Sequence, residues 1–170
     1  MRIALFLAFA LAISGCVQQQ QQVALTTSFN PSEFEWARKD GNNAISGFAV
    51  LRTVGGEART CAGLPAYLGP DSAYTRERIM KIYGSTEKGT RAANDPLKFT
   101  NDDASYRSIL RETRCDGQGG FTFEKVPDGT WYVTTSVVWK ANPSSPLFEG
   151  GNMMRRVEVR GGQTAKVTLP

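Results

Sequence analysis

The sequence predicts a mainly β protein, an antiparallel β-sandwich with a short helix and a long loop inserted at about 71–104. Short β-rich runs recur between clusters of glycine, proline and aspartate, which is typical of a sandwich. The clearest run, residues 130–140, alternates, so that Trp131 and Val133 share one face while Tyr132 lies on the other. An apolar fraction of 41% in 170 residues is enough for one domain with a proper core.

The expected elements lie between these turn clusters. Residues 32–38 are expected to form a helical turn with Ser32 as its N-cap, since Glu35 completes a capping box. Gly161 and Gly162 are a hairpin signal between the last two expected strands. The expected strands span residues 44–53, 59–61, 65–68, 106–115, 120–126, 130–140, 153–160 and 163–169.

The insertion at 71–104 has two parts. Residues 73–83 are predicted to be helical, because Tyr74, Arg78 and Ile82 recur at four-residue spacing, and Gly84 can cap that helix. Residues 85–104 are polar and irregular, and a loop of that length is functional or disordered. Its acidic triplet Asn101-Asp102-Asp103 lacks the spaced ligands of a calcium loop, so we expect no metal there.

The N-terminus carries an export signal. After Arg2, the apolar run at residues 3–13 is too short to span a bilayer but suits a signal-peptide core. Ile13-Ser14-Gly15-Cys16 resembles the lipobox of bacterial lipoproteins. That resemblance implies cleavage after Gly15, so that residues 1–15 are removed, and diacylglyceryl attachment to Cys16. The alternative is an ordinary secretory signal followed by an incidental cysteine.

The residues after Cys16 suggest how the protein is held at a membrane. Several acyl chains would make a stable anchor. Residue 17 is valine and not aspartate, which favours the outer membrane by resemblance to the enterobacterial sorting rule. Residues 16–42 are expected to be the lipidated cysteine and a flexible tether, because the segment is polar and contains the glutamine tract 18–22. The sandwich domain is then expected at 43–170.

The remaining cysteines and the absence of histidine limit the chemistry. Cys61 and Cys115 are an even pair in an oxidising compartment, which favours a disulfide over two reduced thiols. The sequence contains no histidine, which excludes Ser-His-Asp and Cys-His nucleophiles and the usual imidazole metal ligands. Carboxylate pairs or a Ser-Lys pair remain, but no spacing indicates either. We expect no enzyme activity, no metal and no cofactor.

The charge is modestly positive. The formal net charge of +4 falls to +3 when Arg2 leaves with the signal peptide, which is too little to indicate nucleic-acid binding. This balance fits contact with anionic envelope polymers or lipid head groups, but we prefer the explanation that it reflects a mixed solvated surface.

Two segments carry a family resemblance. Residues 48–68 (FAVLRTVGGEARTCAGLPAYL) and 115–133 (CDGQGGFTFEKVPDGTWYV) together resemble the carboxypeptidase regulatory-like, or transthyretin-like, β-sandwich domains of bacterial envelope proteins. The resemblance implies that the turn at 127–129 delivers the next strand into the core. It also implies that Phe121, Phe123 and either Trp131 or Tyr132 are packing residues. The sequence departs from that pattern by the insertion at 71–104.

Two hypotheses for function follow. The first is a non-catalytic binding or structural accessory module, tethered to the periplasmic face of the outer membrane, that contacts an envelope protein through sheet edges or the insertion. Its candidate basic contact surface consists of Arg76, Arg78, Lys81, Lys88 and Arg91. The second is carbohydrate binding, in which an exposed Trp36 or Trp139 stacks on sugar rings of an envelope glycan.

Overall fold

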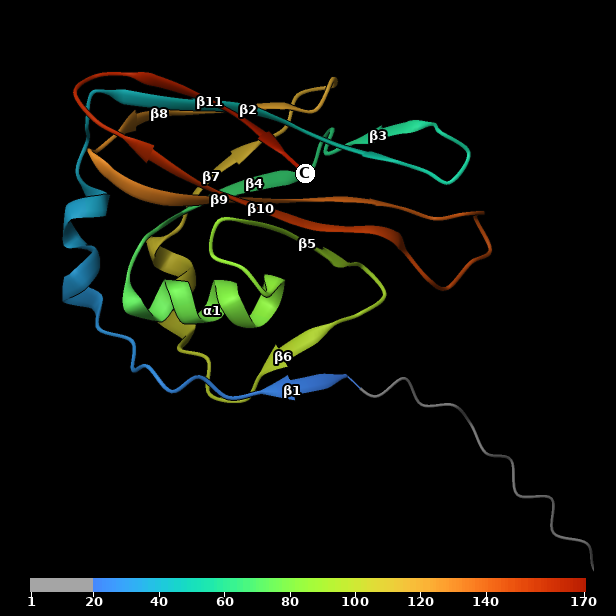
Figure 1. Ribbon diagram of the computed structural model, residues 1–170, viewed down its shortest axis with the longest axis horizontal. Coiled ribbons are helices and arrows are strands. Elements are labelled where there is room, and N and C mark those ends of the chain that lie inside the picture. The colour runs from blue at the N-terminus through green and yellow to red at the C-terminus, as the bar shows by residue number, and fades with distance from the viewer. Residues whose placement is uncertain (1–19) are drawn as a thin grey trace, which may run out of the picture.

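The computed structural model describes residues 20–170, which form a β-sandwich covered on one side by a helix (Figure 1). The predicted fold class is confirmed. The expected signal peptide, residues 1–15, and the expected lipidation site Cys16 lie outside the described residues. Within the described part, no helix is both long and apolar enough to cross a bilayer.

The larger sheet has five antiparallel strands. β9 (Gly129–Trp139) lies at its centre, and its alternation is as predicted: Trp131, Val133 and Val137 are buried between the sheets. Tyr132, on the opposite face, packs beneath the helix with Met154. From edge to edge the strands are β5 (Lys88–Ala92), β10 (Glu149–Val159), β9, β4 (Pro65–Pro70) and β7 (Arg111–Arg114).

The smaller sheet is built around β2 (Asn43–Arg52). β8 (Gly120–Val126) and β3 (Ala58–Thr60) pair antiparallel with β2, whereas β11 (Thr164–Leu169) pairs with it in parallel. The hairpin expected at Gly161 and Gly162 is therefore wrong, because β11 crosses to the other sheet instead of pairing with β10. The backbone N–H groups of Gly162 and Gln163 donate to the Asn43 side chain at 2.8 and 2.9 Å, which holds this turn against the start of β2.

The core fills the space between the two sheets. Phe121 and Phe123 of β8 are buried there, as the family resemblance implies. The Cys61–Cys115 disulfide is confirmed and buried at the rim of this core, with a sequence separation of 54 residues. On the chain-entropy model, a bridge of that separation stabilises the fold by about 4 kcal/mol.

The insertion is more regular than the sequence indicates. The predicted helix is present as α1 (Ala73–Tyr83), with Ser72 as N-cap and Gly84 in the left-handed conformation that ends it. The expected irregular loop 85–104 is wrong, because β5 pairs with β10 and β6 (Leu97–Phe99) pairs with β1 (Gln21–Val23). The expected strand 106–115 is shortened to β7, since a 3-10 helix, η2 (Ala104–Ile109), takes its first part.

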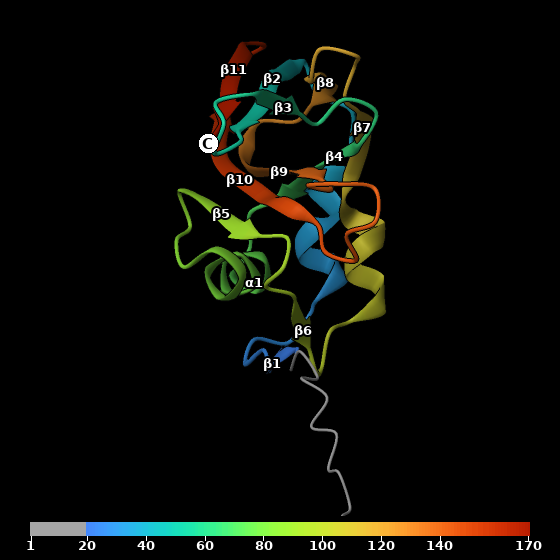
Figure 2. The ribbon, with the colours of Figure 1, turned by 90° about the vertical axis from the view of Figure 1, so that its right-hand side faces the viewer.

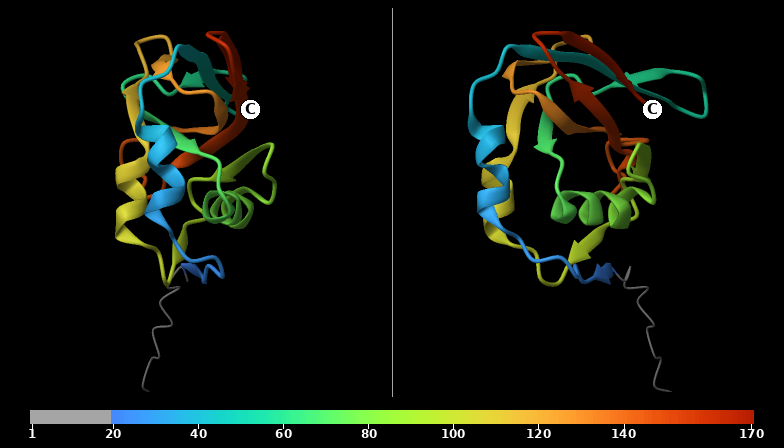
Figure 3. Two further views of the ribbon diagram at one scale, coloured as in Figure 1. Left: turned by 90° about the vertical axis from the view of Figure 1, so that its left-hand side faces the viewer. Right: turned by 60° about the vertical axis from the view of Figure 1, so that its left-hand side comes forward.

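The N-terminal arm, residues 20–42, is part of the folded domain. The flexible tether expected over 16–42 is thus corrected for these residues. Leu25 and Phe34 are buried in a second cluster with Tyr74 and Tyr106, which join the arm to α1 and η2. The expected helical turn is η1 (Pro31–Arg38), with Asn30 and not Ser32 as N-cap. Figure 3 shows η1 and η2 side by side along one end of the sandwich.

Glu77 of α1 fastens the arm to the helix. Its carboxylate accepts hydrogen bonds from the backbone N–H groups of Thr26 and Thr27, both at 2.8 Å, and from the Thr26 hydroxyl at 2.9 Å. These bonds, above all that from the Thr26 backbone, favour the ionised form and lower the pKa of Glu77 to about 2.

We expect the arm contact to weaken only in strong acid. Since the folded-state pKa lies below the usual value, Glu77 contributes stability that is present above about pH 4.5 and lost as the pH falls through about 2. In an NMR titration, the Thr26 and Thr27 amide resonances should move with a midpoint near 2. Glu77→Gln should speed their hydrogen exchange at neutral pH, because one amide oxygen cannot replace two carboxylate oxygens. Glu35→Gln, at an exposed position, should leave them unchanged. A midpoint near pH 4.5 would show that these hydrogen bonds do not lower the pKa of Glu77.

Candidate functional site

The outer face of the smaller sheet exposes a single aromatic ring among polar side chains. Along β2 the residues alternate, so Ile45 and Ala49 are buried while Ser46 and Phe48 face outward. Phe48 is 38% exposed, although large aromatic side chains are usually covered. Its cross-strand partner on β8 is Gly120, which has no side chain to cover that side of the ring.

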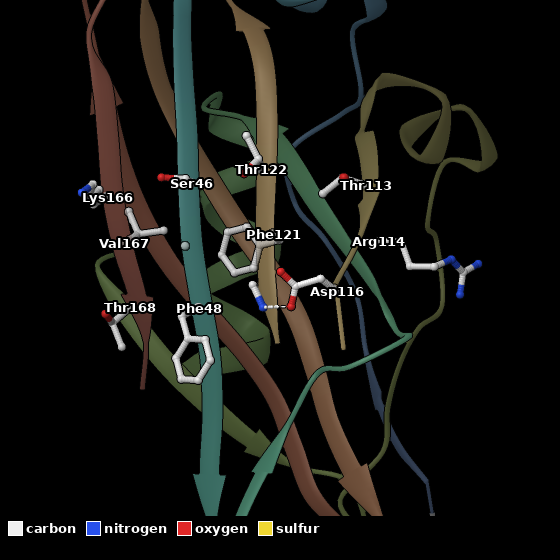
Figure 4. Close-up of a pocket in the computed structure, with 12 residues that line it drawn as sticks. Ser46, Phe48, Thr113, Arg114, Asp116, Phe121, Thr122, Lys166, Val167 and Thr168 are labelled. Atoms are coloured by element: carbon white, nitrogen blue, oxygen red, sulfur yellow. Dashed lines mark hydrogen bonds between the residues drawn. The ribbon is translucent and has the colours of Figure 1, made fainter. Parts of the chain in front are cut away.

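A shallow groove of about 640 Å³ surrounds this ring (Figure 4). Ser46, Thr122 and Thr168 contribute hydroxyl groups from three adjacent strands, β2, β8 and β11. Lys166 and Arg114 stand at opposite flanks of the groove in Figure 4. The groove therefore combines an apolar platform, several hydroxyl groups and two cations.

Asp116 shapes the end of the groove near β8. Its Oδ1 accepts hydrogen bonds from the backbone N–H groups of Gln118 and Gly120, both at 2.8 Å. These bonds, first that from Gly120, hold the pKa of Asp116 below its usual range, so it is ionised at neutral pH. The carboxylate closes the turn into β8. A Cβ on Gly120 would lie 2.7 Å from Oδ2, so a larger residue opposite Phe48 would displace the Asp116 carboxylate.

Gly47 makes the floor of the groove rigid. This residue faces the core, and a Cβ there would lie 2.4 Å from Cζ of Phe121 and 2.6 Å from the Val167 carbonyl oxygen. The Phe121 ring can thus pack directly against the backbone of β2. Because the floor is close-packed strand backbone, the side chains above it are held at fixed spacing.

The side chains of the groove offer contacts for a ligand. Ser46 and Lys166 are register partners on β2 and β11, yet no hydrogen bond joins their side chains. Asp116 is occupied by backbone N–H groups. Among residues 20–170, no group of three or more Cys, Asp or Glu side chains could hold a metal ion. A flat ring rimmed by hydroxyl groups can instead contact the apolar face of a ligand and bond its polar edge.

Two of the five predicted basic contact residues are structural. Arg78 has a side chain only 14% exposed, lies 4.3 Å above the ring centre of Tyr106 and 4.5 Å from that of Phe99, and pairs with Asp102. Arg91 is 13% exposed and bonds Asp95 together with the Ile82 carbonyl. Both arginines bond residues within the insertion, so their side chains are not available for contact with another protein.

The other three basic residues lie on the surface. Arg76 pairs with Asp71 at 2.8 Å while remaining about half exposed, and Lys81 and Lys88 are exposed. Because the Arg76 side chain is half exposed, it remains open to solvent despite this ion pair. The basic surface is thereby reduced to Arg76, Lys81 and Lys88, and its role in binding stays a prediction.

The two tryptophans predicted as sugar platforms are both half-buried. Trp36 packs edge-on against Trp131, with ring centres 5.0 Å apart, and covers Gly129. It also lines a smaller hollow of about 480 Å³ beside Asn42. The indole of Trp139 donates to Glu149 at 2.8 Å and covers Gly150. Sequence reasoning missed Phe48, although the alternation of residues 44–53 already places it on the face opposite Ile45.

The structure was compared with known proteins. No protein-family model matches the sequence, and no curated protein sequence resembles it significantly. One similar structure is the crystal structure of a Pseudomonas aeruginosa protein described as a "putative carbohydrate binding protein". It matches with a TM-score of 0.69 and 24% sequence identity, over 84% of this chain and 97% of the other. At that identity the likeness shows a shared fold.

We expect Arg78 to matter for folding and Lys81 not to. Arg78→Gln should lower the free energy of unfolding by about 2 kcal/mol, because it removes a cation from the rings of Phe99 and Tyr106 and takes the ion pair from Asp102. Lys81→Gln, on the exposed side of the same helix, should change it by less than about 0.5 kcal/mol. Urea denaturation followed by far-UV circular dichroism measures both. Equal stabilities of the two variants would show that Arg78 is not structural.

Proposed function

We propose that this chain is a non-catalytic binding module, anchored by lipid to the periplasmic face of the outer membrane, that recognises envelope glycan through the Phe48 groove. The observation that carries this proposal is an exposed aromatic ring set among hydroxyl-bearing side chains on a rigid sheet. A sugar ring offers a matching surface, since one face presents C–H groups and its rim presents hydroxyl groups. Phe48 would stack on the face, and Ser46, Thr122 and Thr168 would bond the rim.

The charges of the groove narrow the class of glycan. Lys166 and Arg114 flank it, while its one carboxylate, Asp116, is already bonded to backbone N–H groups. The unsatisfied charge is therefore positive, which favours a glycan that carries carboxylates. Peptidoglycan, with its peptide carboxylates, is of this kind. The description of the Pseudomonas aeruginosa protein agrees with a carbohydrate ligand.

A second candidate function is capture of an envelope protein on helix α1. Arg76 and Met80 are four residues apart and share one helix face, where Met80 is 46% exposed. An apolar side chain beside Arg76 and Lys81 is a common arrangement in protein interfaces. This surface lies on the opposite side of the larger sheet from the Phe48 groove, so the two functions are separable by substitution.

The lipid anchor gives a direct test. The mature chain, purified from the bacterial membrane, should begin at Cys16 and carry diacylglycerol on its sulfur, because Ser14-Gly15-Cys16 fits the lipobox. Cys16→Ser should leave residues 1–15 attached and no lipid. Intact-mass spectrometry distinguishes the two chains. A mature wild-type chain of unmodified mass would contradict the anchor.

Phe48→Ala should weaken glycan binding without unfolding the protein. Loss of one stacking ring should lower the affinity for purified peptidoglycan sacculi, measured by co-sedimentation, roughly tenfold, which is about 1.4 kcal/mol of binding free energy. Because Phe48 is exposed, the effect on the stability of the fold should be small. Met80→Ala, at a similarly exposed apolar residue on α1, is the matched control and should bind as wild type. Lys166→Gln should reduce the salt dependence of binding.

Other outcomes would redirect the proposal. Equal sedimentation of Phe48→Ala and wild type would exclude the groove as the glycan site. Loss of sedimentation in Trp36→Phe, with Phe48→Ala unaffected, would move the site to the hollow beside Asn42.

A further inference from the structure

Exposed apolar side chains gather at one side of the molecule. Within residues 20–170, the large hydrophobic side chains that are most exposed are Val54 at 111%, Leu147 at 51% and Phe148 at 49%. Val54 lies in the turn between β2 and β3, and the other two lie in the connection between β9 and β10. Figure 1 shows both tips at the right of the molecule, and Figure 2 views that side directly.

The N-terminal end of the described chain lies at the bottom of the molecule, where β1 begins at its right-hand end (Figure 1). The Gln21 side chain accepts a hydrogen bond from Arg91 at 2.9 Å, and Arg91 is the register partner of Asn152 on β10. Glu149, where β10 begins, directly follows Phe148. β1 is therefore linked to β10 through Arg91 of the edge strand β5, and the right-hand view of Figure 3 shows β1 at the bottom of the molecule, below α1.

The length of chain before Gln20 limits how far the anchor can lie from these tips. Cys16 precedes Gln20 by four residues, and four residues can span at most about 14 Å. Because the folded arm leaves so short a link, acyl chains on Cys16 would hold this side of the domain close to the bilayer. The opposite end, where η1 and η2 lie, would face away from the membrane.

The β9–β10 tip, residues 140–148, has the chemistry of a membrane-interface contact. Leu147 and Phe148 are apolar and exposed, and the Lys140 ammonium lies 5.5 Å from the centre of the Phe148 ring. An apolar pair beside one cation suits the boundary between acyl chains and anionic head groups. The nearest carboxylate, Glu149, already accepts the indole N–H of Trp139.

We propose that the β9–β10 tip inserts into the head-group region of the bilayer that carries the Cys16 lipid, with Val54 as a second contact. The exposed apolar side chains of the tip thus contact the lipids of the bilayer. The tip and the anchor together fix the orientation of the domain, which a single flexible attachment would not. This inference rests on the proposed lipid anchor and is independent of the glycan proposal.

Site-specific photocrosslinking tests the insertion. The full chain, made in bacteria with p-benzoylphenylalanine at position 148, 80 or 20, is purified with its lipid and placed in vesicles of phosphatidylethanolamine and phosphatidylglycerol. Position 148 keeps an aromatic side chain, position 80 is an equally exposed control on α1, and position 20 reports the anchor. After irradiation, mass spectrometry measures phospholipid adducts.

We expect phospholipid adducts at positions 20 and 148, with roughly tenfold less at position 80. Adducts at 20 without adducts at 148 would overturn the insertion while leaving the anchor intact. Equal adducts at 148 and 80 would also overturn it, because they would show contact without orientation. An unmodified Cys16 in the same mass spectra would overturn the anchor, and the insertion with it. In whole cells, a protein adduct at 148 in place of lipid would assign the tip to a protein partner.

Discussion

The buried side chain of Asn43 sets the register on which the smaller sheet depends. Its Nδ2 donates to the Val126 carbonyl at 2.9 Å and to the Asp128 carboxylate at 2.8 Å, while its Oδ1 accepts from the backbone N–H groups of Gly162 and Gln163. One carboxamide thereby joins the start of β2 to the turn before β9 and the turn before β11. A buried amide left unbonded costs about 1 to 3 kcal/mol, so any other register is disfavoured.

That register decides which side chains the Phe48 groove contains. A slip of one residue would turn Ile45 outward and Phe48 into the core, since strand side chains alternate. With Asn43 in place, Phe48 stands opposite Gly120 on one side and beside Thr168 on the other. The same bond from Asn43, followed by that from the Gly161 backbone, lowers the pKa of Asp128, which keeps the carboxylate ionised as a hydrogen-bond acceptor. The proposed glycan site is thus a consequence of how the strands are aligned.

Patterns within one segment could be read from the sequence, and contacts between distant segments could not. The alternation of residues 130–140 and the four-residue spacing in 73–83 predicted β9 and α1, because each element carries its own period. β5 was missed, since it is a polar strand at the edge of the larger sheet, where it pairs with β10. Spacing placed Arg78 on a helix but could not show that Phe99 and Tyr106 lie beneath it. Alternation along residues 44–53 could have predicted which face of the sheet Phe48 lies on. Its exposure could not be predicted, because it depends on Gly120, far along the chain.

The arrangement of the Phe48 groove and the proposed lipid anchor is compatible with one orientation at the membrane. Figure 1 shows the smaller sheet as the upper layer of the molecule, with the hairpin tips at the right and β1 at the bottom, where it begins at its right-hand end. When the right-hand side lies against the bilayer, the outer face of the smaller sheet is roughly perpendicular to the membrane plane. Phe48 on that face then does not face the lipid. A glycan can then reach the groove from the aqueous side without passing between protein and bilayer. The tip needs only a weak contact of its own for this, because the short link to the proposed anchor raises its effective concentration at the bilayer.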